Sequence, residues 1–169
     1  GEPSLTPTIG FMSDGSAYYR VRVTCGGNSV YSDTLYLSVQ PAFMAGTYTI
    51  DRNAQPSSTN FTSLMAAYNA MNCGISGPVV FNVVANSGIY TEQVKFGRVK
   101  GASAVNTITF NGNGNTLKFN STNSNERAVL KIDGGKHFII NNFIIDATQG
   151  TYGFAVQLTN DADNNIIRN

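Results

Sequence analysis

Four aspartates in the C-terminal part of the chain are candidates for binding a metal ion or for acid–base catalysis: Asp133, Asp146, Asp161 and Asp163. Carboxylate oxygens are ligands that Ca²⁺ prefers, and two carboxyl groups that flank a glycosidic bond can hydrolyse it. Asp161 and Asp163 are two residues apart, so in a strand they would share one face. They lie, however, in the polar segment 159–165, which indicates a turn, and carboxylates in turns are usually solvated. We therefore expect no metal site here, and nothing in the sequence supports a cluster of Asp146 with Asp161.

The chain contains one histidine, His137, which follows Gly134, Gly135 and Lys136 at a turn. No nucleophile stands at motif spacing from it, so we interpret His137 as a surface residue rather than a general base. The sequence Asn-Gly-Asn-Gly-Asn at 111–115 is no phosphate loop, because it lacks the Lys-Ser/Thr ending and no helix follows. We expect no catalytic residue and no cofactor.

These polar residues are interspersed among short apolar strands that return at a nearly fixed interval. One series has the leading residues Phe81, Ile108, Leu130 and Val156, with steps of 27 (108 − 81), 22 (130 − 108) and 26 (156 − 130). A second series has the leading residues Val94, Leu117, Phe138 and Ile166, with steps of 23 (117 − 94), 21 (138 − 117) and 28 (166 − 138). Two interleaved series of similar period predict a parallel β-helix, in which each coil gives a strand to two or three sheets.

The segments between these strands are rich in Gly and Asn, at 111–115, 133–135, 141–142 and 164–165. Both residue types tolerate left-handed backbone conformations. Asn-Gly pairs are also typical of hairpins, so an antiparallel meander is the alternative. A meander has no reason to repeat near 22 residues, and we therefore predict an all-β solenoid of three to four coils.

The N-terminal part differs in pattern. Residues 17–24 and 30–39 alternate in hydropathy around a Gly26-Gly27-Asn28 turn, which predicts a β-hairpin of half-buried strands. Residues 46–51 are predicted to form one strand. The apolar run 77–84 predicts another strand, buried on both faces.

Between these two strands, residues 60–72 have the apolar spacing of an amphipathic helix, with Phe61, Leu64, Met65, Tyr68 and Met71 on one face. Thr59 or Asn60 is the expected N-cap, and Cys73-Gly74 the expected end. We expect this helix to bury its apolar face against the first coil and cap its open strand edges.

Composition restricts the class of protein. Charged residues make up 12% of the 169, and the formal net charge of +1 includes no basic cluster, which argues against a nucleic-acid partner. No apolar run approaches the roughly 20 residues that cross a bilayer, so no membrane insertion is expected. Cys25 and Cys73 are too few for a disulfide framework, and either two buried thiols or a single bridge fits the sequence.

The run Asp14-Gly15-Ser16-Ala17-Tyr18-Tyr19 with its alternating continuation resembles the last strands of an immunoglobulin-like domain. In that family a Tyr anchors a corner two residues before a Cys. Val21 stands at the Cys position, so the resemblance implies no inter-sheet disulfide. About seven strands make a complete sandwich, and residues 1–40 would supply only its C-terminal strands.

The pieces GTYTID, NFTSLMAAYNAMN, SGPVVFNVV, IYTEQVKF and GASAVNTITFNG resemble the N-terminal cap and first coil of pectate-lyase-like right-handed β-helices. Such modules occur in large multidomain surface proteins of gliding-type Gram-negative bacteria. The resemblance implies a right-handed parallel β-helix over residues 41–169 and an extracellular or cell-surface location. Lyases of this fold hold calcium with several Asp residues on one sheet and use an Arg or Lys as base. The candidate bases are Lys131, Lys136, Arg127 and Arg168.

We predict a non-catalytic structural or adhesive segment of an extracellular protein, with carbohydrate binding and self-assembly into fibres as open possibilities. The competing hypothesis is a polysaccharide lyase or glycoside hydrolase whose site lies in coils beyond this sequence. An acidic cluster with a nearby Arg on one sheet would favour the enzyme. A face of flat Asn or Thr ladders, or of aligned aromatic residues, would favour binding. Ile166 and Ile167 are expected to form an edge strand with no Pro, Lys-rich segment or helix to protect it. We therefore expect further coils or another chain to cover the C-terminal coil.

Overall fold

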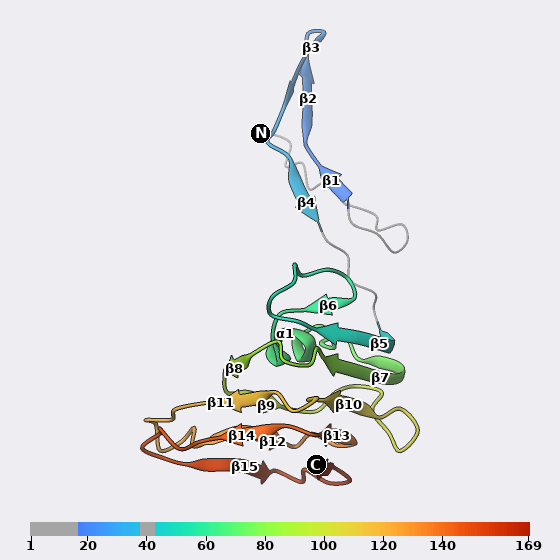
Figure 1. The fold of residues 1–169 in the computed structure, drawn as a ribbon. Coiled ribbons are helices and arrows are strands. Elements are labelled where there is room, and N and C mark those ends of the chain that lie inside the picture. Colours follow the sequence, from blue (N-terminus) through green and yellow to red (C-terminus); the bar gives the residue numbers. More distant parts are fainter. Residues whose placement is uncertain (1–16, 38–42) are drawn as a thin grey trace. The chain divides into compact units, whose positions relative to one another are not determined.

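The computed structural model describes residues 17–37 and 43–169, in two units, Gly1–Pro41 and Ala42–Asn169. In the first unit, strand β1 (Ala17–Tyr19) pairs antiparallel with β4 (Leu35–Leu37), and β2 (Arg22–Cys25) pairs antiparallel with β3 (Asn28–Tyr31) (Figure 1). The predicted hairpin is confirmed, and Gly26 and Gly27 turn it with positive φ angles. Its expected half-burial is wrong, because Val21 and Val23 are exposed. Asp14 to Ser16, the start of the immunoglobulin-like run, lie outside the described residues.

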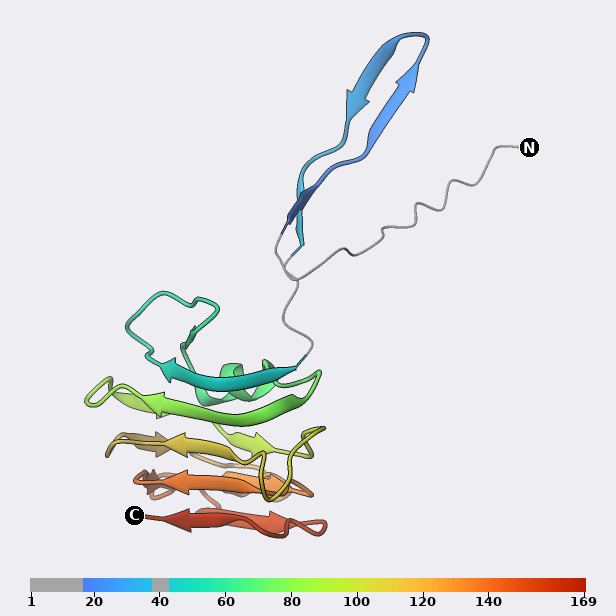
Figure 2. The same cartoon turned by 90° about the vertical axis from the view of Figure 1, so that its right-hand side faces the viewer.

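The second unit is a parallel β-solenoid of about four turns built from three sheets (Figure 2). Sheet 1 has the strand order β16-β13-β10-β7-β5-β6, sheet 2 the order β14-β11-β8, and sheet 3 the order β15-β12-β9. The sheet 1 strands are β5 (Met44–Ile50), β6 (Asn60–Phe61), β7 (Ile75–Val83), β10 (Ile108–Asn111), β13 (Phe138–Asn141) and β16 (Ile166–Arg168). Sheet 2 contains β8 (Ile89–Thr91), β11 (Thr116–Lys118) and β14 (Ile144–Asp146). Sheet 3 contains β9 (Val94–Phe96), β12 (Ala128–Asp133) and β15 (Phe154–Thr159). The parallel pairing confirms the solenoid over the meander.

The strand register corrects the predicted repeat. Ile108 pairs with Val79 and Phe138, which gives coil steps of 29 (108 − 79) and 30 (138 − 108). Leu130, which the sequence placed in one series with Ile108, belongs to sheet 3 and pairs with Val94 and Val156. The steps in sheet 3 are 36 (130 − 94) and 26 (156 − 130), because the first spans both long loops, 97–107 and 119–127. Three strands per coil and unequal loops produced the apparent period near 22.

The core is a stack of aromatic rings between columns of aliphatic side chains. The rings of Phe81, Phe110, Phe96 and Phe138 follow one another at centroid distances of 4.7, 4.8 and 4.9 Å, and all four are buried. Fully burying one such side chain stabilises the fold by about 1.5–3 kcal/mol. In β7 the inward residues are buried, whereas Val80 and Asn82 on the outer face are half-exposed. The expected burial on both faces of this strand is therefore wrong.

Left-handed residues turn the chain between sheets, as predicted for the Gly and Asn segments. Asn113, Gly114, Gly134, Asn142 and Asn164 all have positive φ angles. The turns also stack on one another, since the Gly114 N–H donates to the Asn142 carbonyl oxygen at 2.9 Å.

Helix α1 (Leu64–Asn69) is shorter than the predicted 60–72. Asn60 and Phe61 instead extend sheet 1 as β6, because they pair with Thr49 and Ile50 of β5. The N-cap is Ser63, not Thr59 or Asn60, and its Oγ accepts from the Ala66 N–H at 3.0 Å. Of the predicted apolar face, Leu64 and Met71 are buried, and Phe61, Met65 and Tyr68 pack partly buried against the core.

Candidate functional site

The four aspartates come from different parts of the solenoid and do not meet in one cluster. Asp133 ends β12 in sheet 3, Asp146 ends β14 in sheet 2, and Asp161 and Asp163 lie in the turn between β15 and β16. Among residues 17–37 and 43–169, no three His, Cys, Asp or Glu side chains are grouped so that they could hold a metal ion. Coil topology therefore separates residues that the sequence places within 30 positions (163 − 133) of one another.

Asp146 and Asp133 are held ionised by local donors. The Thr148 hydroxyl and backbone N–H donate to Asp146 Oδ1 at 2.6 and 2.9 Å, and Lys118 Nζ lies 3.2 Å from Oδ2. These contacts lower the pKa of Asp146 to about 2. The Asn160 amide donates to Asp133 at 2.5 Å and, as the largest cause, lowers the pKa of that carboxyl. A glycosidase acid needs a raised pKa, so neither carboxyl is prepared for general acid catalysis.

The four candidate bases all have structural partners. Lys136 Nζ lies 2.9 Å from Asp163 Oδ2, and Lys131 Nζ lies 3.6 Å from Asp133 Oδ2. Arg127 donates to the Ser124 carbonyl oxygen and stacks over the Tyr152 ring. Arg168 Nε donates to Asn141 Oδ1 at 2.9 Å. Lys136, Arg168 and the Arg127–Tyr152 contact join residues of successive coils, whereas Lys131 and Asp133 lie in the same strand.

The thiols differ from both interpretations of the sequence. Cys25 and Cys73 are free and exposed, so they are neither buried nor bridged to each other.

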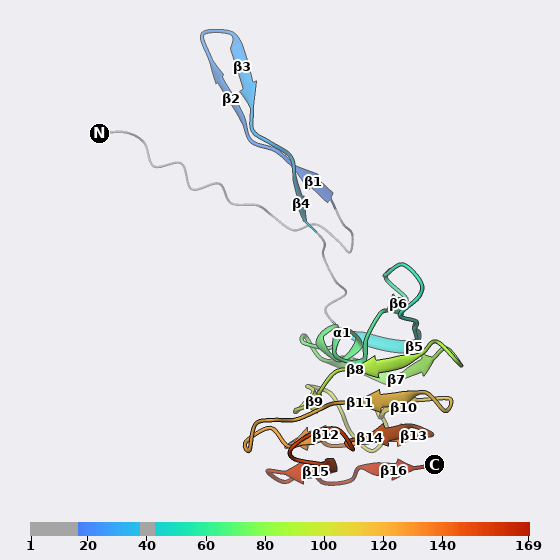
Figure 3. The same ribbon diagram turned by 60° about the vertical axis from the view of Figure 1, so that its left-hand side comes forward.

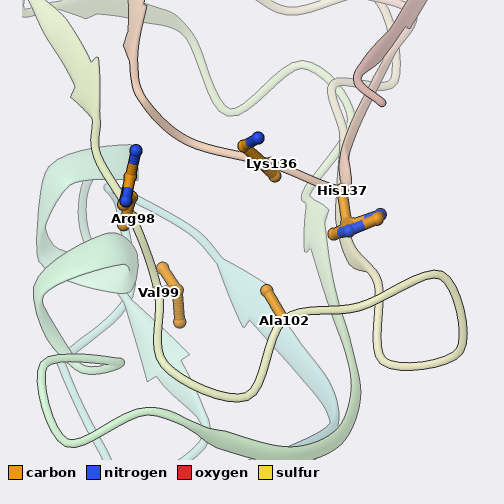
Figure 4. A pocket seen from close by; sticks show the side chains of 5 residues that line it. All are labelled: Arg98, Val99, Ala102, Lys136 and His137. Atoms are coloured by element: carbon orange, nitrogen blue, oxygen red, sulfur yellow. The ribbon is translucent and has the colours of Figure 1, made fainter. Parts of the chain in front are cut away.

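His137 is half-buried between two cavities and has a positive φ of 63°. The first cavity, of about 220 Å³, is lined by Arg98, Val99, Ala102, Lys136 and His137. In Figure 4, Arg98, Val99 and Ala102 lie on one loop, and Lys136 and His137 lie on the segment across from it. The second, of about 350 Å³, is lined by Ala104, Thr107, His137, Ile139, Asn164, Asn165 and Ile166. Sequence reasoning missed Arg98 and this loop, although the long gap between the strands ending at 96 and starting at 108 was visible.

A continuous polar row runs along the outer face of sheet 1. The Asn111 amide donates to Asn82 Oδ1 at 2.8 Å, and the Asn141 amide donates to Asn111 Oδ1 at 2.8 Å. Arg168 continues the row at one end, and Thr49 precedes Asn82 at the other. The register produces this ladder, because it aligns residues 29 and 30 positions apart in the sequence.

A second row lies beside the asparagines on the same face. It contains the paired residues Thr47, Val80, Thr109, Ile139 and Ile166. We call the two rows together, with Thr49, Asn82, Asn111, Asn141 and Arg168, the ladder face. Each asparagine amide has two N–H donors and two carbonyl lone pairs. The bond to each neighbour uses one donor and one lone pair, so further hydrogen-bonding capacity faces outward.

No family model, no curated protein and no solved structure matches this chain. Within the described residues, none of the helices has the length and apolar character needed to cross a membrane.

Proposed function

We propose that this chain is a non-catalytic structural or adhesive segment of an extracellular protein, and that the ladder face binds carbohydrate. The ladder face is the observation that carries the proposal. Its first row is a regular series of hydrogen-bonded amides, and its second row contains two threonine hydroxyls beside the apolar Val80, Ile139 and Ile166. The carboxylates, in contrast, are dispersed and engaged with lysines, threonines and an asparagine.

The chemistry of the ladder face suits a polyol ligand. Sheet strands lie about 4.8 Å apart, so equivalent amides repeat at that interval along the solenoid. Because Asn82, Asn111 and Asn141 hold one another by hydrogen bonds, little side-chain entropy is lost on binding. Apart from Arg168 at its end, the face has no formal charge, which favours neutral sugar hydroxyls over anionic groups.

The remaining features fit an extracellular rod. A right-handed winding is supported by the strong preference for right-handed connections between parallel strands. The N-terminal hairpin is consistent with the closing strands of an immunoglobulin-like domain, and the parallel coils are consistent with a pectate-lyase-like module. The low share of charged residues, 12%, agrees with a secreted β-rich protein.

We also propose that residues 51–69 form an N-terminal cap. Tyr68 of α1 accepts a hydrogen bond from the Gly97 N–H just beyond β9 at 2.9 Å, and Met65 Sδ lies 3.3 Å from the Lys95 N. Arg52 donates to the Ile89 carbonyl oxygen of β8. Side chains of this segment thereby occupy backbone groups on the outer edges of sheets 2 and 3.

The test is binding of purified chain to insoluble and arrayed neutral polysaccharides, with Thr109→Lys as the disabling variant. Thr109 lies in the middle of the ladder face, and a lysine there would cover the row without breaking the asparagine bonds. Thr116→Lys on the outer face of sheet 2 is the matched control, since Thr116 is also a half-exposed outward strand residue. We expect a loss of roughly tenfold or more in affinity for Thr109→Lys only, about 1.4 kcal/mol.

Two results would overturn the proposal. One is equal binding by both variants, which would place any glycan contact elsewhere. The other is new ultraviolet absorbance from polygalacturonate or alginate, abolished in Asp161→Ala or Asp163→Ala, which would establish a lyase.

A further inference from the structure

The cavity of about 220 Å³ at the corner between sheets 3 and 1 is lined by three basic side chains, Arg98, Lys136 and His137. Arg98 belongs to the loop between β9 and β10, and Lys136 and His137 belong to the turn between β12 and β13. Strands β10 and β13 are paired and lie in successive layers of the solenoid (Figure 3), so the loop and the turn end one above the other. All the lining residues are described, and none belongs to the last coil.

Two glycines of the turn let the Arg98 side chain lie across it. A Cβ added at Gly134, which has a positive φ of 69°, would lie 3.3 Å from Arg98 Nε. At the adjacent Gly135, an added Cβ would lie only 2.9 Å from the Gly97 carbonyl oxygen. The loop and the turn therefore approach each other closely only because these positions have no side chain. This approach places the Arg98 side chain beside the segment that contains the other two basic residues (Figure 4).

His137 occupies a backbone position that asparagine fills in the following coil. Ile139 pairs with Ile166, so the same offset of 27 residues (166 − 139) aligns His137 with Asn164. Both residues have positive φ angles, of 63° and 56°. Asparagine tolerates this conformation well, so the turn itself does not require an imidazole. His137 adds a ring with an N–H donor to the lining of the cavity.

The cavity has one positive charge without a counter-ion in the described chain. Lys136 Nζ is paired with Asp163, 2.9 Å from Oδ2. Arg98 forms no ion pair with any carboxylate of residues 17–37 and 43–169. Its side chain is exposed, and a guanidinium offers five N–H donors in a planar fork. The arrangement therefore suits a ligand group with a single negative charge and several acceptor oxygens.

We propose that this cavity binds the sulfate ester group of a glycan. A sulfate monoester has one negative charge, which matches the charge of Arg98, whereas a phosphate monoester has about −1.5 to −2 at neutral pH. A sulfate ester also has three free oxygens, and the cavity offers donors from three side chains on two segments. A carboxylate has only two oxygens, and the fork of Arg98 alone would satisfy both.

His137 connects this cavity to the ladder face. It also lines the second cavity, together with Thr107 and Ile139, and Ile139 belongs to the ladder face. A glycan that binds the ladder face through its hydroxyls can therefore place a sulfate substituent against His137 and Arg98. That a glycan carries the sulfate rests on the proposed function, whereas the anion site itself rests on the cavity and its charge.

The experiment compares oligosaccharides of a sulfated galactan with the same oligosaccharides after desulfation, by isothermal titration calorimetry. The wild type should bind the sulfated form roughly tenfold more tightly or better. Arg98→Gln should lose this preference. His137→Asn, which keeps a residue suited to the positive φ, should reduce it several-fold. Lys100→Gln is the matched control, because it removes one charge from an exposed residue of the same loop that does not line the cavity, and it should keep the preference.

A second measurement uses inorganic sulfate alone, without a glycan. In NMR titrations, sulfate should shift the Arg98 Nε–H and His137 ring signals of the wild type. The His137 ring signals should stay in place in Arg98→Gln at the same sulfate concentrations. Unshifted Arg98 and His137 signals in the wild type would overturn the anion site.

Three calorimetric results would overturn the proposal. They are equal affinity for the sulfated and desulfated forms, an equal loss in Lys100→Gln and Arg98→Gln, and Arg98-dependent binding of oligogalacturonate as tight as that of the sulfated galactan. The last would show that the cavity accepts any anion. If neutral glycans bind and Thr109→Lys weakens them, but the sulfate preference is absent, only this inference fails. If no glycan binds but inorganic sulfate shifts the His137 signals, the proposed function fails and the anion site stands.

Discussion

Both ends of the solenoid have strand edges, but the edges at the N-terminal end are in contact with other residues and those of the last coil are exposed. At the N-terminal end, residues 51–69 contribute β6, α1 and the side chains of Arg52 and Tyr68 to the backbone groups of β5, β8 and the end of β9. At the C-terminal end, Ile144, Phe154, Leu158, Ile166 and Ile167 are exposed. Ile132 and Ile140, the partners of Leu158 and Ile167 in the preceding coil, are buried. The residue types are therefore alike, and only the exposure of the side chains differs.

At the N-terminal end, residues 51–69 make a different contact with each of the three sheets. Helix α1 has six residues and contacts β9 of sheet 3 and β6 of sheet 1. Sheet 1 is extended by the two-residue strand β6. Arg52 donates to the Ile89 carbonyl oxygen of sheet 2, and the Asn53 amide donates to the Ser87 carbonyl oxygen just before that strand at 2.8 Å. The three sheets are thus contacted in three different ways. The last coil has no equivalent in the described chain.

The largest expected contrast is between two leucines. Leu64→Ala removes a side chain that is 1% exposed at the N-terminal end, and we expect the free energy of unfolding to fall by about 2–5 kcal/mol. Leu158→Ala at the C-terminal end should cost less than about 1 kcal/mol, because half of the side chain already faces water. Urea unfolding of both variants measures the difference. Equal costs would mean that the two ends are equally covered.

A smaller effect is expected for Glu92. Its two carboxylate oxygens accept from the Leu64 and Met65 N–H groups at 2.9 and 3.1 Å and so join the turn before β9 to the start of α1. Glu92→Ala leaves both partly buried donors without this acceptor and should cost about 1–3 kcal/mol. Glu92→Gln is the matched control, since it keeps one carbonyl acceptor and should recover part of the loss. A neutral Glu92→Ala variant in urea unfolding would show that α1 is held by packing alone.

The smallest effect concerns the pH dependence of stability, which should have opposite signs for two carboxyl groups. Burial raises the pKa of Glu92, although the two backbone donors act against it, whereas the pKa of Asp146 is lowered to about 2. The contribution from Glu92 is present at low pH and is lost as pH rises through its folded pKa. The contribution from Asp146 is present near neutral pH and is lost as pH falls through about 2.

Carboxyl-resolved NMR titration checks both directions. Asp146 should titrate near 2 and Glu92 above the usual glutamate range. Lys118→Ala should move the Asp146 midpoint upward, since Lys118 Nζ lies 3.2 Å from its carboxylate. Two midpoints at ordinary values would contradict the hydrogen-bond environments described for both groups.

The sequence predicted a parallel solenoid because its strands and turns each have a recognisable local sequence pattern. Short apolar strands that recur between Gly and Asn segments favoured stacked parallel sheets over a meander, and Asn113, Asn142 and Gly134 adopt the left-handed conformations that these residue types favour. The exact repeat was beyond reach, because a strand pattern does not say to which sheet a strand belongs. Leu130 and Ile108 have the same local pattern, yet they lie in sheets 3 and 1.

The type of candidate site could be predicted from the sequence, but the residues that form it could not. A ladder of Asn or Thr was named as the sign of a binding face, but its members could not be identified. The alignment of Asn82, Asn111 and Asn141 depends on the strand register, and the lengths of loops 97–107 and 119–127 hide that register in the sequence. The helix start was missed for a similar reason, since pairing of Asn60 with Thr49 is a tertiary contact that overrides the apolar helix spacing. The aspartates look alike in the sequence, yet Asp146 accepts from Thr148 two residues away, whereas Asp133 accepts from Asn160 of the next coil.

Hydrogen exchange in a verified monomer tests the difference between the ends most directly. In dilute solution, the Gly97 amide, which donates to Tyr68, and the Asp51 amide, which donates to Phe61, should exchange slowly. Segment 154–168 of the last coil should exchange orders of magnitude faster, because an uncovered edge opens locally. Equal, strong protection of Ile166 and Ile167 in the monomer would contradict the account, since it would mean that the exposed last coil opens no more readily than the first.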